Sequence, residues 1–118
     1  MESENQNSLG IIIARTSTVS GNAEQAVDLG LATQKAGRKV GIFLISDGVW
    51  NAINNSGPVS EKLSKLAQGG SNILVSDEHV RAGGIPVDRM INGIEIVDKT
   101  YKILVEHVME EWDKVIIC

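Results

Sequence analysis

The chain has 118 residues, of which 42% are hydrophobic and 22% charged, as expected for one globular domain able to build its own core. Its net charge of −4 and lack of a Lys/Arg-rich run argue against nucleic-acid binding, because contact with phosphates needs a basic surface. Its apolar runs are too short to cross a bilayer, and its one cysteine, Cys118, fits a reducing cytoplasm and excludes an internal disulfide.

The first eight residues are polar and acidic, and they lack the basic and apolar regions of a signal peptide. We expect residues 1–8 to form a disordered tail and residues 9–118 to form a single α/β domain. Aromatic residues make up only 3% of the chain, so aliphatic side chains must supply the core.

Short, nearly continuous β-branched runs predict the strands, because strands covered on both faces of a parallel sheet show little polar alternation. The four clear runs are Leu9–Ala14, Lys39–Ile45, Ser71–Ser76 and Val115–Cys118, and Gly93–Val97 is a weaker fifth.

Helical patterns lie between these runs. One runs from Asn22 to Gly37, and a second runs from Pro58 to a Gly69-Gly70 stop. After the third strand we expect a short helix over Asp77–Ala82 and a single turn over Asp88–Ile91. The last helix, capped by Asp98 or Thr100, carries an apolar stripe of Tyr101, Leu104, Val105, Val108 and Trp112. A polar stretch, Asp47–Gly57, follows the second strand.

Alternation of strands and helices predicts a single-domain three-layer α/β sandwich with a mostly parallel five-stranded sheet. In such sheets ligands bind in the crevice beyond the carboxyl ends of the strands. The loops that follow the strands are therefore the candidate binding segments.

The loop after the first strand is rich in hydroxyl groups and opens a helix, where backbone N–H groups can hold an anion. Thr18, Ser20 and Asn22 resemble the phosphate-binding loop of flavodoxins, which grips FMN. The alternative is an ordinary serine-capped helix start. We expect no cofactor, and the alternative is that this loop binds FMN.

The loop after the second strand places Asp47, Trp50 and Asn51 at the crevice, with Gly48 allowing a tight turn. An acidic group, an aromatic ring and an amide there can bind a ligand. The alternative is that Trp50 fills a subunit interface or the edge of the core, and the interface is favoured because tryptophan is frequent at interface hot spots.

After the third strand comes a polar cluster of Ser76, Asp77, His79 and Arg81, which could bind a small anion or transfer protons. The alternative is a solvated helix that Ser76 or Asp77 caps. The two histidines, His79 and His107, have no ligand spacing, so no metal site is expected.

Several segments together resemble the DsrE/DsrF/DsrH family, and TusD and DsrE most closely. They are Asp47-Gly48-Val49-Trp50-Asn51-Ala52, Asn72-Ile73-Leu74-Val75, Arg81-Ala82-Gly83-Gly84-Ile85 and Trp112-Asp113-Lys114-Val115. The likeness covers about 110 residues. It implies a sulfur-relay role, in which a cysteine just after the third strand carries a persulfide.

The chain departs from that pattern at the reactive position, because no cysteine lies between Asn72 and Ile85. Leu74 aligns best with the family cysteine, and a small shift would place Val75 or Ser76 there. None of these side chains can form a persulfide. Cys118, at the end of the last strand, could replace the lost thiol, or it could be an inert apolar residue.

The resemblance thus implies a non-catalytic or small-ligand-binding subunit of a cytoplasmic oligomer. The expected partners are further copies of the chain, in a trimer or hexamer, or related subunits in a mixed assembly. A sulfur-carrier protein is a further candidate partner. Binding to nucleic acid or to a membrane is not expected. Whether the chain is an enzyme stays open. The alternatives are FMN or phosphate binding at Thr18–Asn22 and sulfur transfer through Cys118.

Overall fold

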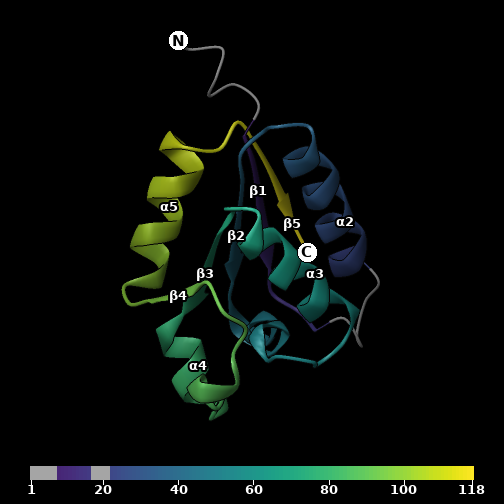
Figure 1. Ribbon diagram of the computed structural model, residues 1–118. Coiled ribbons are helices and arrows are strands. Elements are labelled where there is room, and N and C mark those ends of the chain that lie inside the picture. The colour runs from purple at the N-terminus through teal and green to yellow at the C-terminus, as the bar shows by residue number, and fades with distance from the viewer. Residues whose placement is uncertain (1–7, 17–21) are drawn as a thin grey trace.

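The computed structural model describes residues 8–16 and 22–118, and these form a three-layer α/β sandwich (Figure 1). The strands are β1 (Leu9–Ile13), β2 (Val40–Leu44), β3 (Asn72–Ser76), β4 (Ile94–Val97) and β5 (Lys114–Ile117). The helices are α2 (Asn22–Lys35), α3 (Pro58–Gln68), α4 (Asp77–Gly83) and α5 (Thr100–Glu110), with 3-10 helices η1 (Ser46–Ala52) and η2 (Val87–Arg89).

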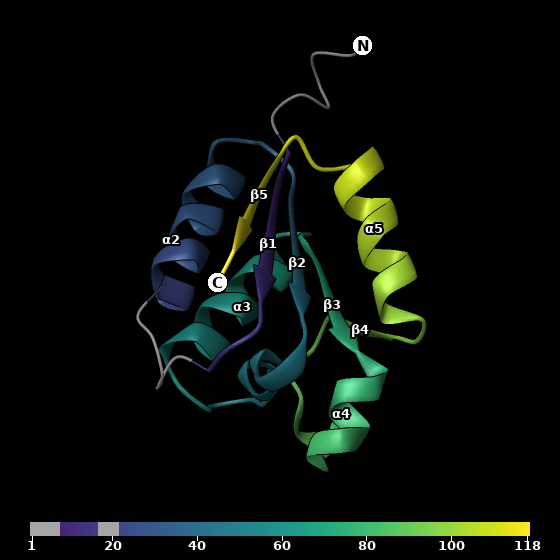
Figure 2. The same cartoon turned by 180° about the vertical axis from the view of Figure 1, so that it is seen from behind.

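The sheet of the described chain has the order β4-β3-β2-β1-β5, and every neighbouring pair is parallel. The five predicted strands are confirmed to within about a residue, and the sheet is wholly rather than mostly parallel. Every connection must therefore cross from one end of the sheet to the other, so all strands end at one edge. We call this edge, from which η1 and α4 emerge, the carboxyl rim (Figures 1 and 2).

Side chains of successive strand residues point to opposite faces, which gives two apolar layers. On one face, strand residues such as Ile11, Ile42 and Val75 pack beneath α2 and α3. Gly30 lets α2 approach closely, because a Cβ there would lie 3.1 Å from the Cδ1 atom of Ile11. The absence of a side chain at Gly30 therefore allows α2 to pack close to the sheet.

A single helix, α5, covers the other face, where Ile12, Phe43 and Leu74 form the buried layer. Figures 1 and 2 show α5 on the side of the sheet opposite α2 and α3. The packed residues of α5 are Ile103, Leu104 and Val108, whereas Tyr101 and Val105 are 59% and 57% exposed. The predicted stripe was wrong in including these two.

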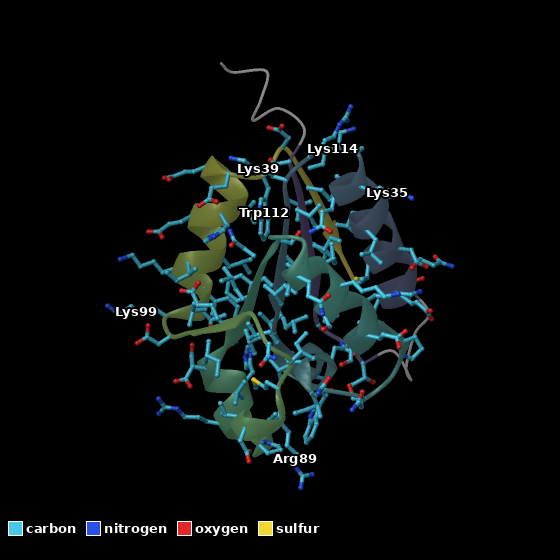
Figure 3. All side chains as sticks on the ribbon, in the orientation of Figure 1. Lys35, Lys39, Arg89, Lys99, Trp112 and Lys114 are labelled. Atoms are coloured by element: carbon cyan, nitrogen blue, oxygen red, sulfur yellow. The ribbon has the colours of Figure 1, made fainter. Side chains whose placement is uncertain are left out.

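The start and end of α5 also differ from expectation. Its cap residue is Lys99, at φ 51°, and no side chain caps the helix. The prediction of Asp98 or Thr100 as the cap was therefore wrong. Thr100 is the first helical residue, and its hydroxyl bonds to Ser76 instead. Trp112 lies beyond the helix end and its indole covers Gly10 and Gly41, which are opposite each other on β1 and β2 (Figure 3).

Ser8, which was expected to belong to the tail, is buried. Its carbonyl accepts hydrogen bonds from the N–H groups of Asp113 and Lys114.

Lys62 of α3 pairs with Glu24 and Asp28 of α2. Its hydrogen bond to Asp28, and to a smaller extent its hydrogen bond to Glu24, raises the pKa of its ammonium group.

Candidate functional site

The carboxyl rim brings together the segments that follow β1, β2, β3 and β5. Asp47 lies in η1 after β2, Asp77 opens α4 after β3, and Cys118 follows β5. The rim expected from the strand pattern therefore exists, because all five described strands run in one direction. Thr18 and Ser20 fall outside the described residues, and Asn22 is the exposed first residue of α2.

The stretch expected to be a polar connection is instead the well-packed helix η1, in which Gly48, Val49, Asn51 and Ala52 are buried. A Cβ on Gly48 would overlap the carbonyl oxygen of Ile13. Only glycine therefore allows η1 to lie directly against the end of β1, and this approach fixes the position of Trp50.

One hydrogen bond ties η1 to α4. The N–H of Ser46 donates to Nδ1 of His79 at 2.9 Å, which places the ring proton of a neutral His79 on Nε2. Ser46 adopts φ 51°, a left-handed conformation that is uncommon for residues with a side chain. The bond to His79 therefore joins the loops after β2 and β3 at a turn with an unusual backbone.

Asn51 holds the loop after β1. Its Nδ2 group donates to the carbonyl oxygens of Arg15 at 3.0 Å and of Gly48 at 3.1 Å, and the residue is only 5% exposed. The amide hydrogens that could have reached a ligand are thus used inside the protein. Asn51 positions the rim rather than presenting a free donor to it.

Ser76 ends β3 and is completely buried. Its Oγ lies 2.6 Å from Oγ1 of Thr100, which is also fully buried, and it accepts a bond from the N–H of His79 as the cap of α4. The prediction that Ser76 caps α4 is confirmed, and its hydroxyl has no access to a ligand. Leu74, which the sequence comparison placed at the reactive position, is buried within β3 beneath α5.

Asp77 and Arg81 form an ion pair one turn apart on α4, with 2.6 Å between Oδ2 and Nη2. The Arg81 side chain is 78% exposed, so the pair stands in solvent and contributes little to stability. This arrangement fits the solvated-helix alternative. Asp77 also lines a shallow hollow of about 440 Å³ together with Glu95 and Asp98 at the β4 edge.

Trp50 stands between two hollows of the rim and is 42% exposed. The smaller, about 200 Å³, brings together three predicted residues, Asp47, Trp50 and His79. The larger, about 390 Å³, is also bordered by Trp50 and is lined by Thr16, Trp50, Asn51, Ile53, Ser56, Pro86 and Arg89. We call the larger one the Arg89 hollow.

Sequence reasoning missed most of the Arg89 hollow, because the contacts that form it join distant loops. Ile53 and Met90 form an isolated antiparallel bridge, and the N–H of Asn54 donates to the carbonyl of Arg89 at 2.8 Å. These bonds hold the segment after α4 against the segment after η1. No local pattern around Arg89 could have indicated this pairing.

Cys118 lies apart from these hollows. Its Sγ is 3.7 Å from the carbonyl oxygen of Ile12, the residue is half-buried, and burial raises the pKa of its thiol. β5 is three places from β3 in the sheet, so the thiol and Ser76 are separated by roughly 14 Å at the usual strand spacing. Cys118 therefore shares no site with His79.

The described residues include no cluster of three or more His, Cys, Asp or Glu side chains suited to a metal ion. Over the same residues, no helix has both the length and the apolar character needed to cross a bilayer.

In sequence, the chain matches no family model and no curated protein. In structure it is similar to the ychN protein of E. coli, with a TM-score of 0.72, 19% identity, and 94% and 99% of the two chains covered. It is also similar to MTH1491 of Methanobacterium thermoautotrophicum, a protein of unknown function, with a TM-score of 0.73, 18% identity, and 94% and 98% covered. BT1422 of Bacteroides thetaiotaomicron, likewise a protein of unknown function, is similar with a TM-score of 0.73 and 16% identity, and 97% of each chain is covered. These likenesses establish a DsrE-like α/β fold for the chain, as the sequence predicted.

Proposed function

We propose that the protein is a cytoplasmic, non-catalytic subunit of the sulfur-relay type that binds a small ligand at its carboxyl rim. The state of Ser76 carries this proposal. Leu74, which aligns best with the family's persulfide-bearing cysteine, is buried and has no nucleophilic atom. At Ser76, which a small shift of the alignment would match instead, the chain has a hydroxyl group that is buried and bonded to Thr100. A hydroxyl group cannot form a persulfide, and this one is out of reach of a partner protein.

The ligand-binding part of the proposal is supported by Trp50. A large aromatic ring that is 42% exposed between two hollows offers a flat apolar surface beside polar groups. Ligand sites are typically concave and combine apolar walls with a few polar groups. The two hollows beside Trp50 combine both features, and no thiol of the described chain lines either of them.

Persulfide uptake tests the missing chemistry. The wild-type protein and the Cys118→Ser variant are incubated with a persulfide donor, and their intact masses are compared, with a known persulfide-carrying protein as positive control. We expect no gain of a sulfur atom by either protein, because burial raises the pKa of Cys118 and disfavours the reactive thiolate. Uptake that requires Cys118 would refute the proposal and support sulfur transfer through that residue. A yellow purified protein would instead support FMN binding.

We also propose that the chain assembles into a trimer or hexamer, alone or with related subunits. The exposed apolar side chains Tyr101 and Val105, one turn apart on α5, support this, because exposed apolar groups of this size often mark interfaces. Light scattering after size separation measures the assembly. We expect Val105→Asp to weaken it and Leu29→Asp, at an exposed aliphatic residue of α2, to leave it unchanged. A strict wild-type monomer would contradict self-assembly.

A further inference from the structure

We infer that the Arg89 hollow binds a small anion that carries a flat ring, such as an aromatic carboxylate. The ring would lie on the indole of Trp50 and the anionic group near the guanidinium of Arg89. This inference rests on the proposed ligand-binding role of the rim and specifies the site and the class of ligand.

Size is the first reason to choose the Arg89 hollow over the hollow beside His79. At about 390 Å³ it falls within the roughly 300–1,000 Å³ typical of small-molecule sites. The hollow beside His79, at about 200 Å³, is below that range. Of the two hollows beside Trp50, the Arg89 hollow therefore has the more usual size for a ligand site.

Charge is the second reason. Among the described residues, no carboxylate lines the Arg89 hollow, whereas Asp47 lines the hollow beside His79, and Asp77, Glu95 and Asp98 line the one at the β4 edge. The chain as a whole carries a net charge of −4. An anion approaching the rim is thus attracted at this hollow and repelled at the other two.

The state of Arg89 is the third reason. No carboxylate of the described chain pairs with its side chain, unlike Arg81 and Lys62, which are both in ion pairs. Figure 3 shows Arg89 extending from the carboxyl rim at the lower end of the molecule. A guanidinium group presents a planar set of donors that matches a carboxylate or phosphate.

The walls of the Arg89 hollow are held in place before any ligand arrives. The bridge between Ile53 and Met90, together with the bond from the N–H of Asn54 to the carbonyl of Arg89, holds the backbone at Arg89. The two bonds from Asn51 hold the helix that carries Trp50. The hydroxyl-bearing residues Thr16 and Ser56 complete the lining. A preorganised site loses less entropy on binding than a flexible one.

Three probes separate the contributions of ring and charge. Benzoate has both, acetate has only the charge, and benzyl alcohol has only the ring. Binding to the wild-type protein is followed by NMR through the indole N–H of Trp50 and the ring signals of His79. We expect saturable, millimolar binding of benzoate that shifts the Trp50 signal, and binding at least about tenfold weaker for the other two probes.

Variants then test the two contacts. We expect Arg89→Gln to weaken benzoate binding about three- to fivefold, as for an exposed ion pair, and Trp50→Leu to weaken it about tenfold. Lys35→Gln removes a positive charge from the exposed last residue of α2, at the opposite end of the sheet from the rim, and should leave binding unchanged. Circular dichroism of each variant checks that the fold is retained.

The outcomes distinguish this inference from the broader proposal. Equal binding of all three probes, or no loss in Arg89→Gln, would overturn the assigned ligand class. Benzoate shifts confined to His79 would overturn the assigned hollow while leaving a rim ligand site in place. Persulfide uptake, measured separately by mass, bears only on the proposed absence of sulfur chemistry.

Discussion

The indole of Trp112 and the paired glycines of β1 and β2 should be strongly coupled energetically. A Cβ on Gly10 would overlap the six-membered ring of Trp112, and a Cβ on Gly41 would lie 2.7 Å from Nε1. Gly10 lies in an extended strand, so alanine fits its backbone, and the ring is the obstacle. Gly10→Ala should therefore cost about 1–3 kcal/mol, as for other overpacked sites.

The same substitution should be almost free when the ring is absent. Trp112→Ala alone should cost about 2–4 kcal/mol, slightly less than the loss of a fully buried tryptophan, because Trp112 is partly exposed. In that background the methyl group of Gly10→Ala enters the vacated space. The two substitutions should thus be non-additive, with a coupling of about 1–3 kcal/mol.

Urea unfolding followed by far-ultraviolet circular dichroism measures this coupling, since tryptophan fluorescence changes with the substitution itself. The four proteins are the wild type, each single variant and the double variant. Gly10→Ala combined with Leu29→Ala, at an exposed site on α2, is the additive control. Strict additivity of Gly10→Ala and Trp112→Ala would show that the indole does not lie over Gly10 and Gly41.

Three further outcomes follow from the rim and its borders. Gly48→Ala should lower the free energy of unfolding by about 1–3 kcal/mol in urea titrations, because its Cβ would meet the carbonyl of Ile13; an unchanged midpoint would mean that η1 does not lie against β1. Ser76→Ala should cost about 1–3 kcal/mol by leaving the Thr100 hydroxyl unpaired, whereas Ser76→Ala combined with Thr100→Val should cost clearly less than the sum of its parts. Burial raises the pKa of Cys118, so its alkylation in the native protein should need a higher pH than in urea. The thiol's stabilising contribution should also be lost as pH rises through the native pKa. Identical pH profiles of alkylation in the native and urea-unfolded protein would contradict the raised pKa.

The sequence was sufficient for the architecture, because the strands carry their signal locally. Runs such as Leu9–Ile13 and Val40–Leu44 contain only aliphatic residues, one phenylalanine and glycines. A continuous apolar run of this kind is typical of strands that are buried on both faces. Alternation with helices then predicts parallel pairing and a common rim. The positions of Asp47 and Asp77 at that rim follow from the same reasoning.

The structure of η1 could not be predicted in the same way. Its polar composition resembles a loop, and it forms a helix because Gly48 fits against β1 and Asn51 bonds to the carbonyl of Arg15. Both contacts join residues more than thirty positions apart. Local propensity contains no information about such partners.

Tertiary contacts also decided which polar residues are available to a ligand. The hydroxyl of Ser76 is withdrawn into the core by Thr100, and Arg81 is paired with Asp77. Arg89, which has no distinctive local pattern, is brought to Trp50 by a single bridge between two loops. The sequence therefore determined the sheet and its rim, because hydrophobic patterns are local. The binding surface depended on pairings between loops, which only the folded chain shows.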